Sequence, residues 1–216
     1  MRSAAPAPPG TASVVFGPAT ELACRYATML ATRGVERGLI GPREVPRLWE
    51  RHLLNCGVIA GLVPGDVDVV DIGSGAGLPG VVIAMLRPQL HVTLLEPLLR
   101  RTVFLGECVA ELGLANVTVC RGRAEDMAGA LHADVAISRA VAPLGRLAEL
   151  SAGVVRPGGM ILAVKGQQAQ AELDQAAPAL RRLGVRSAEV LQAGHGIVEP
   201  PATVIRILTA DRARRR

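Results

Sequence analysis

A glycine-dense turn follows a short apolar run near the middle of the chain. The run, residues 67–72, is rich in β-branched side chains and has Asp71 near its end, which is typical of a buried parallel strand that ends in a polar residue. Residues 78–86 are apolar with helical spacing. A strand, a glycine turn and a helix form the first half of a βαβ unit that binds a nucleotide-like ligand, because glycine lets the backbone approach the ligand and the helix N-terminus offers free N–H groups. The glycines of this turn are Gly73, Gly75, Gly77 and Gly80.

A second acid stands at the end of the next apolar run. Residues 91–95 read as a strand, and Glu96 follows it, 25 residues after Asp71. An acid at this place accepts hydrogen bonds from the vicinal hydroxyls of a ribose. The pair predicts an adenosine-type cofactor and leaves both NAD and S-adenosylmethionine (SAM) open. A glycine turn that joins a strand to a helix without any ligand is the remaining alternative.

Composition limits the classes of protein that need to be considered. A chain of 216 residues suits one α/β domain with a small extension. The net charge of +5 favours a polyanionic partner, and Lys165 is the only lysine among 24 basic residues. The four cysteines are far apart and form no CxxC motif, so we expect neither a metal site nor a disulfide. No signal peptide and no apolar run of about 20 residues is present, so we expect no membrane partner and a cytoplasmic location.

The elements that must position the turn fall into four segments. We expect residues 1–18, which are rich in proline and alanine, to be disordered, and residues 19–64 to form a helical extension with helices over 19–32 and 43–61. Residues 65–210 would form the main domain, and residues 211–216 a basic tail. In the second helix of the extension, Arg51 and His52 are polar side chains that can reach a ligand.

The main domain reads as alternating strands and helices. Strands are expected over 67–72, 91–95, 116–120, 133–138, 160–164, 185–191 and 203–208, with helices over 98–112 and 167–183. Ligands of such folds bind at the carboxyl ends of adjacent strands, where Asp71, Glu96, the loop 123–126 and Arg139 would gather. The prediction is an α/β, Rossmann-like class I SAM-dependent methyltransferase fold. Its sheet is seven-stranded and mostly parallel with an antiparallel last strand, and it has helices on both faces and a small N-terminal helical extension.

Four segments together resemble one family. The segments DIGSGAGLPG, WERHLLN, ISRAVAPL and AVKG, which span about residues 49–165, are similar to the bacterial small-subunit rRNA guanine-N7 methyltransferases, also called glucose-inhibited division protein B. The resemblance implies SAM as cofactor, S-adenosylhomocysteine as product and a guanine of 16S rRNA as substrate, either in naked RNA or in the 30S subunit. It also implies SAM contacts at Gly73, Leu78, Ala124, Glu125 and Arg139.

Further site residues are assigned by position. The strand-end argument adds Asp71, Gly75 and Glu96 to the expected cofactor contacts. No residue stands out as catalytic, and Arg139 and Lys165 are the candidates for positioning the substrate. Lys165 has an alternative role, a salt bridge within the fold. The residues expected to bind RNA are Arg51, His52, Arg123, Arg139 and Lys165.

Methylation at guanine N7 explains why no base is prominent. N7 carries an in-plane lone pair, so catalysis can rest on in-line alignment of nucleophile, methyl carbon and sulfur at about 3 Å. Arg139 and Lys165 would then hold phosphate or guanine O6. An Asn-Pro-Pro-aromatic loop, used to methylate adenine amines, is absent after the fourth strand, and so is the Pro-Cys context of carbon-5 methylation.

Two other functions stay open on the sequence. An NAD(P)-dependent oxidoreductase would use the same turn and would need a hydride-transfer acid such as a Tyr-Lys pair or a His, but the only tyrosine, Tyr26, lies in the N-terminal helical region, which counts against it. A non-catalytic RNA-binding protein could keep the fold as a scaffold, although the intact turn and Glu96 argue against that. We expect a monomer.

Overall fold

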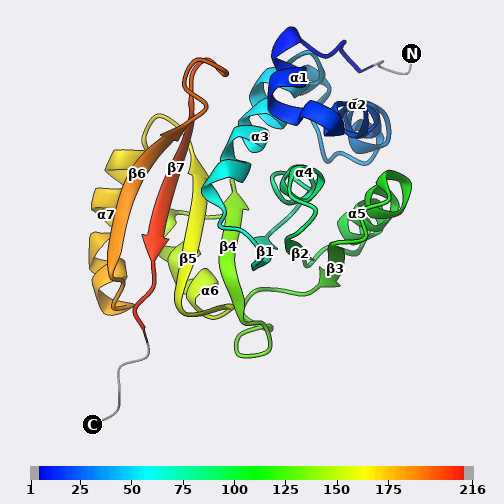
Figure 1. Cartoon of the computed structure of the whole chain (residues 1–216). Helices are drawn as coiled ribbons and strands as arrows, with labels where there is room; N and C mark the ends of the chain where they lie inside the picture. The colour runs from blue at the N-terminus through cyan, green and yellow to red at the C-terminus, as the bar shows by residue number, and fades with distance from the viewer. Residues whose placement is uncertain (1–4, 212–216) are drawn as a thin grey trace.

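A seven-stranded sheet runs through the middle of the molecule (Figure 1). The computed structural model describes residues 5–211. The strand order is β3-β2-β1-β4-β5-β7-β6, and β7 runs antiparallel to both of its neighbours while the other pairs are parallel. The predicted mostly parallel sheet with an antiparallel last strand is therefore confirmed. The strands are β1 Asp68–Ile72, β2 His91–Glu96, β3 Val117–Arg121, β4 Ala133–Arg139, β5 Val155–Lys165, β6 Ser187–Ala193 and β7 Ala202–Leu208.

The order of the strands places three carboxyl ends side by side. Strand β1 lies between β2 and β4, so the chain leaves the sheet in opposite directions on its two sides, and ligands of such folds bind at that point. In the register, Ile72 pairs with Leu95 and Asp71 pairs with Ile137. The glycine turn after β1, Glu96 at the end of β2 and Arg139 at the end of β4 thus lie at one edge.

Helices cover both faces of the sheet, as predicted (Figure 1). Side chains alternate along each strand, so that Val69 joins one apolar core and Val70 the other. The first core is covered by the N-terminal extension together with α4 and α5, and the second by α6 and α7. The bounds of these helices are α4 Gly80–Leu86, α5 Leu99–Leu112, α6 Leu144–Ala152 and α7 Ala169–Arg182.

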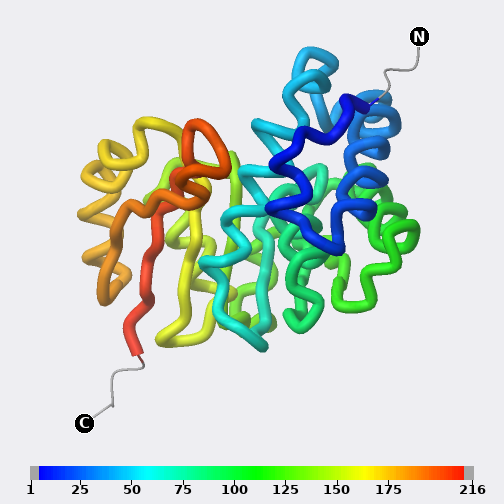
Figure 2. The backbone as a smooth tube through the Cα atoms, turned by 45° about the horizontal axis from the view of Figure 1, so that its top comes forward, coloured from blue at the N-terminus to red at the C-terminus, as the bar shows by residue number. Residues whose placement is uncertain are grey.

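The N-terminal extension packs over α4 and α5 (Figure 2). The segment 43–61, expected as a helix, is helical throughout, but the helix type changes along it. Pro46, which lacks a backbone N–H, lies in its 3-10 portion. The elements are α1 Gly10–Phe16, η1 Gly17–Ala19, α2 Thr20–Met29, η2 Leu30–Gly34, η3 Pro42–Arg47, η4 Leu48–Leu54, α3 Asn55–Ile59 and η5 Ala60–Leu62, of which η2 and η4 are π-helical and the other η segments 3-10.

The expectation of disorder over residues 1–18 is wrong for helix α1. Two of its side chains, Ala12 and Phe16, are buried, and the ring of Phe16 meets Trp49 edge-on with 6.1 Å between centroids. The indole Nε1 of Trp49 donates to the carbonyl of Pro6 at 2.9 Å. Burial of a few apolar side chains therefore orders a segment whose composition is typical of disorder.

Strand β5 is longer than predicted. The expected strand covered only residues 160–164, whereas residues 157–159 also lie inside β5, next to a register shift between Ala133 and Val135 of β4. Residues 212–216 of the expected basic tail lie outside the described residues, and the domain boundaries stay predictions. Within residues 5–211, no helix is long and apolar enough to cross a membrane, and no group of three His, Cys, Asp or Glu side chains could hold a metal ion.

Candidate active site

Three adjoining hollows follow the carboxyl ends of β1, β2, β4 and β5. The Glu96 pocket, about 390 Å³, is lined by Glu96, the loop 122–125 and Val141. The turn pocket, about 240 Å³, is lined by residues 73–76, Leu78, His52 and Arg139. The cleft, about 940 Å³, extends from Arg139 over the end of β5 to the loop between β6 and β7, and among its lining residues are Arg51, Asn55, Lys165, Glu172 and His195.

Ala140 joins the three hollows. It lines all of them, and Arg139 lines both the turn pocket and the cleft. The φ angle of Ala140 is +55°, in the left-handed region that residues with a Cβ rarely adopt. Such conformations persist where the surrounding structure enforces them, and they concentrate at functional sites. The backbone after β4 is therefore held in an unusual conformation at the point where the three hollows meet.

Glu96 binds the glycine turn from the end of β2. It is 1% exposed, and its Oε2 accepts a hydrogen bond from the Gly75 N–H at 2.9 Å, while its Oε1 accepts one from the Leu98 N–H at 3.1 Å. The guanidinium of Arg101 lies 3.5 Å from Oε2. Each carboxylate oxygen can accept more than one hydrogen bond, so both remain suited to ribose hydroxyls in the Glu96 pocket.

Gly73 must lack a side chain because Val141 covers it. A Cβ on Gly73 would lie 2.9 Å from Cγ2 of Val141, and its φ angle is +68°. The N–H of Gly73 donates to the Leu95 carbonyl at 2.8 Å, which ties the turn to the end of β2. The turn therefore presents bare backbone to the pockets on either side, as a turn that binds an adenosine-type cofactor requires.

Asp71 occupies a different position from the one expected of a cofactor contact. Its side chain is 1% exposed, lines none of the three hollows and accepts a hydrogen bond from the Gly80 N–H at 3.0 Å. It therefore caps the first turn of α4. Burial raises the pKa of Asp71 to about 7. Side chains alternate along β1, so Asp71 shares with Val69 the face that α4 covers.

Arg139 is held by a chain of polar contacts from the extension. Its Nη2 lies 2.7 Å from Nδ1 of His52, and Nε2 of His52 lies 3.0 Å from Oε2 of Glu44. Arg139 Nη1 also lies 3.5 Å from the thiol of Cys56. Burial, together with the nearby Arg139 charge, lowers the pKa of His52 to about 4. A neutral imidazole with its proton on Nε2 accepts from Arg139 and donates to Glu44, so every contact in the chain is satisfied.

Lys165 forms the salt bridge that the sequence left open as its alternative role. Its Nζ lies 2.7 Å from Oε2 of Glu172 and donates to the carbonyl of Ala142 at 3.1 Å. The lysine side chain is 10% exposed, so little of it reaches solvent. Lys165 nevertheless lines the cleft, and its contact with RNA stays a prediction.

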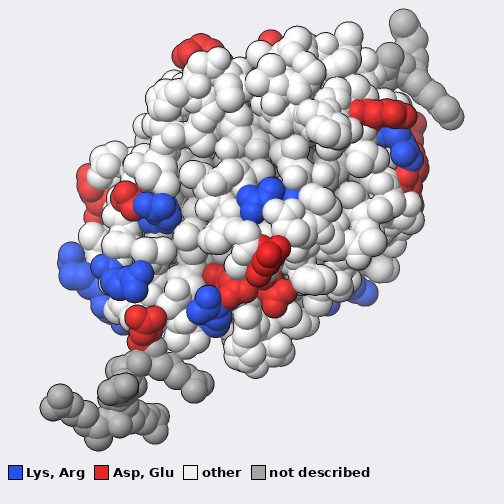
Figure 3. Space-filling model, in the orientation of Figure 1, with Lys and Arg blue, Asp and Glu red and all other residues white. Residues whose placement is uncertain are grey.

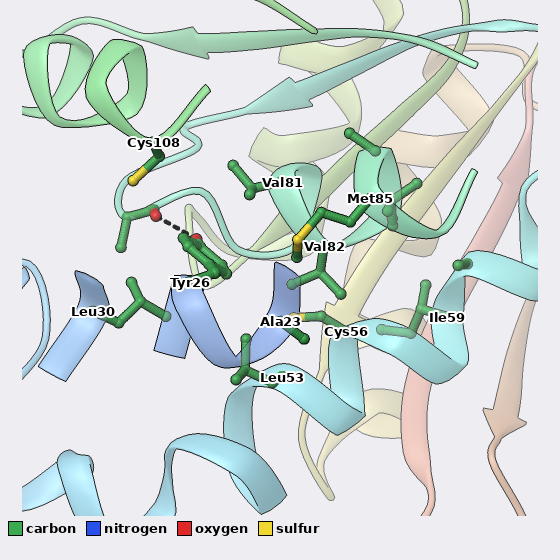
Figure 4. Close-up of a cluster of buried hydrophobic side chains, with 14 of the residues drawn as sticks. Ala23, Tyr26, Leu30, Leu53, Cys56, Ile59, Val81, Val82, Met85 and Cys108 are labelled. Carbon is green, nitrogen blue, oxygen red and sulfur yellow. Dashed lines mark hydrogen bonds between the residues drawn. The ribbon is translucent and has the colours of Figure 1, made fainter. Parts of the chain in front are cut away.

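Sequence reasoning missed Tyr26. Its hydroxyl donates to the carbonyl of Ala76 in the glycine turn at 2.6 Å, and its ring is fully buried among apolar side chains (Figure 4). Burial raises the pKa of Tyr26 well above its usual value, so the hydroxyl stays a donor. The only sequence signal was that the chain has a single tyrosine, which does not indicate a partner 50 residues away.

The structure separates the predicted residues into groups. The turn pocket holds Gly73, Gly75, Leu78, His52 and Arg139, and the cleft holds Arg51, Arg139 and Lys165. Arg123, expected to bind RNA, lines the Glu96 pocket instead, beside the expected cofactor contacts Ala124 and Glu125. The side chain of Glu125 is ion-paired with Arg146 at 2.6 Å. The ligand contacts of all these residues stay predictions.

Comparison with known proteins identifies the family. A model of the family described as rRNA small subunit methyltransferase G matches residues 19–198. The chain belongs to this family. It is 56% identical over 200 residues to ribosomal RNA small subunit methyltransferase G of Thermobifida fusca, a match covering 93% of this chain and 84% of the relative. It is 55% identical over 210 residues to the protein of the same name from Streptomyces avermitilis, covering 96% and 88%.

Membership of the family confirms the function that the four segments implied. The chain is a SAM-dependent rRNA methyltransferase, with the guanine-N7 specificity of its family.

Solved structures confirm the fold class. A SAM-dependent O-methyltransferase from Thermotoga maritima superposes with a TM-score of 0.58 at 16% identity, covering 74% of this chain and 66% of that one. TYW2 of M. jannaschii, solved in complex with AdoMet, superposes with a TM-score of 0.59 at 16% identity, covering 77% and 78%. At such identities the likeness shows the fold alone, which is the Rossmann-like methyltransferase fold.

Proposed function

We propose that SAM lies across the Glu96 pocket and the turn pocket, and that the target guanine of small-subunit rRNA enters from the cleft, where its N7 accepts the methyl group. The observation that carries this arrangement is the shared wall of the hollows, because Ala140 lines all three and Arg139 lines two. Because the hollows share these residues, a cofactor bound in the two pockets and a base bound in the cleft would lie next to each other.

The residues of the Glu96 pocket fit the adenosyl part of the cofactor. Glu96 presents a buried carboxylate to ribose hydroxyls, and the apolar side chains that line the same pocket, among them Ala124 and Val141, suit an adenine ring. At Gly75 an added Cβ would meet only the Gly73 carbonyl oxygen, at 3.8 Å, so the rest of the cofactor can lie against the backbone there. When bound, SAM supplies an activated methyl group on a positively charged sulfur.

The chain's task in the chemical step is alignment. Guanine N7 attacks through a lone pair that needs no deprotonation, so a base is not required. Arg139 is fixed by His52 and Cys56 between the turn pocket and the cleft, where it can hold an RNA phosphate or guanine O6. A side chain that is already ordered loses little entropy when it binds, so positioning substrate by Arg139 is efficient.

We further propose that S-adenosylhomocysteine is the second product, that the substrate is 16S rRNA either free or assembled in the 30S subunit, and that the enzyme works as a cytoplasmic monomer without a metal.

Methyl transfer from labelled SAM to two substrates tests the proposal. The substrates are 30S subunits from a strain that lacks this methylation, and 16S rRNA extracted from them. Label is expected on at least one of the two substrates.

Glu96→Gln is expected to raise the KM for SAM about tenfold and to leave the KM for RNA unchanged, because it removes the charge that favours the ribose hydrogen bonds. Glu189→Gln is the matched control, since Glu189 pairs with Arg206 outside the three hollows. Binding of NADH in place of SAM, with no label on either RNA, would contradict the proposal.

A further inference from the structure

The cleft contains a carboxylate that a phosphate-binding surface would not favour. Glu172, in the first turn of α7, lines the cleft and lies 2.7 Å from Nζ of Lys165 at the end of β5. Its side chain is 32% exposed, against 10% for Lys165. Within residues 5–211, the second carboxylate oxygen, Oε1, has no hydrogen-bond or ion-pair partner. The pair therefore offers the cleft an open acceptor beside a donor.

The charge of the pair argues against a phosphate as its ligand. Glu172 neutralises Lys165 and repels phosphate, whereas Arg139 elsewhere in the cleft contacts the neutral His52 and carries the positive charge that phosphates need. A pair with no net charge that offers a hydrogen-bond acceptor beside a donor suits an uncharged group that presents a donor beside an acceptor. The Watson–Crick edge of guanine has this pattern, with donors at N1 and N2 and an acceptor at O6.

We propose that Glu172 and Lys165 read the Watson–Crick edge of the target guanine, with Glu172 accepting from N1–H and the N2 amine and Lys165 donating to O6. The inference rests on the proposed function and adds how the base is chosen. Adenine presents a donor at N6 and an acceptor at N1, so both contacts would be repulsive. Because N7 lies on the other side of O6 from N1, a guanine held by this edge keeps N7 free.

Glu172→Gln, which keeps the shape and removes the charge, is the first test, with Glu189→Gln as the matched control. Transfer to unmethylated 30S subunits or 16S rRNA is expected to lose about 10- to 100-fold in kcat/KM in Glu172→Gln, and little in the control. The dissociation constant for SAM and the melting temperature report that the fold is intact. If Glu172 only neutralises Lys165, its loss frees a cation for phosphate, so that the KM for RNA falls while kcat is unchanged. That result overturns the inference.

Inosine at the target position gives the second test. Inosine lacks the N2 amine, and it can be placed in 16S rRNA by joining synthetic and transcribed segments. The wild-type protein is expected to lose about tenfold in kcat/KM on this RNA, and Glu172→Gln to lose little more than it already has, because both changes remove the same contact. If the fold losses in kcat/KM due to inosine and to Glu172→Gln multiply when the two changes are combined, the changes act independently and the inference is overturned. If the wild-type protein forms no 7-methylguanosine on RNA with guanine at the target position, the proposed function is overturned as well. If the wild-type protein methylates this RNA and Glu172→Gln has the same kcat/KM as the wild type, only the inference is overturned.

Discussion

Two buried residues of the site respond to pH in opposite directions. The pKa of Asp71 is raised to about 7, so its contribution to stability is complete below pH 3.8 and is lost as pH rises through 7. The pKa of His52 is lowered to about 4, so its contribution is complete above pH 6.5 and is lost as pH falls toward 4. Between about pH 4 and 6.5, Asp71 lowers the free energy of unfolding as pH rises and His52 raises it. The two effects cancel, so the wild-type protein shows neither of them.

Asp71→Asn is expected to reveal the slope due to His52. Asparagine keeps an oxygen for the Gly80 N–H but cannot ionise. The free energy of unfolding of the variant, relative to the wild type, should therefore rise between pH 4 and 6.5, by at most about 1.4 kcal/mol per pH unit. Urea unfolding across this range measures the difference. Parallel curves for the two proteins would show that Asp71 is already ionised in the folded state.

At the scale of elements, the N-terminal extension supports the glycine turn. Helix α2 contributes Tyr26, whose hydroxyl binds Ala76, and the ring packs with α4 residues such as Val81 (Figure 4). A Cβ on Gly77 would lie 2.7 Å from the tyrosine hydroxyl, so the turn and the ring are closely fitted. The extension thus helps to hold the turn against which we propose that the cofactor binds, although it lies outside the sheet.

Tyr26→Phe is expected to weaken SAM binding about 3- to 10-fold. The change keeps the ring but leaves the buried Ala76 carbonyl without its donor, which costs about 1 kcal/mol and loosens the turn. Trp49→Phe is the control, because it also removes one hydrogen bond from an aromatic side chain of the extension to a backbone carbonyl, that of Pro6. Calorimetric titration measures the dissociation constant for SAM in both variants. If the two variants lose the same stability and bind SAM equally well, Tyr26 does not position the glycine turn for SAM.

How far the sequence predicts the structure differs between elements. The strands and the glycine turn were predictable because β-branched runs and glycine spacing are local signals. Tyr26 and Ala76 meet only through the packing of the extension, and no local pattern records this. The acid Asp71 beside the turn suggested a ligand contact, yet strand alternation places it under α4. The partner of Lys165 depended on where α7 begins, which the helical pattern locates only within a few residues.

At the scale of the whole molecule, charges of both signs are mixed on the face drawn in Figure 3, where basic and acidic side chains lie close together. Many arginines of residues 5–211 are ion-paired, among them Arg51 with Glu44 and Arg156 with Asp134. The cations that line the cleft are therefore the ones whose contribution to RNA binding can be tested one at a time.

Arg51→Gln is expected to weaken RNA binding and to reduce its salt dependence. Arg51 lines the cleft, so losing one phosphate contact should reduce the slope of log K against log salt by about 0.7 to 0.9. Arg156→Gln is the control, because its side chain is equally exposed, 52% against 51%, but pairs with Asp134 at the amino end of the sheet. Filter binding of 16S rRNA at several salt concentrations measures both slopes. An equal change in the two variants would place the RNA elsewhere.

Nucleoside mass spectrometry of the methylated RNA tests the central claim most directly. Unmethylated 30S subunits and 16S rRNA are treated with labelled SAM and the wild-type protein, Arg139→Ala or Arg156→Gln. We predict label in 7-methylguanosine with the wild type and with Arg156→Gln, and a loss of 100-fold or more in rate with Arg139→Ala, because Arg139 lies where the turn pocket and the cleft meet. Label in any other nucleoside, or full activity of Arg139→Ala, would contradict the account.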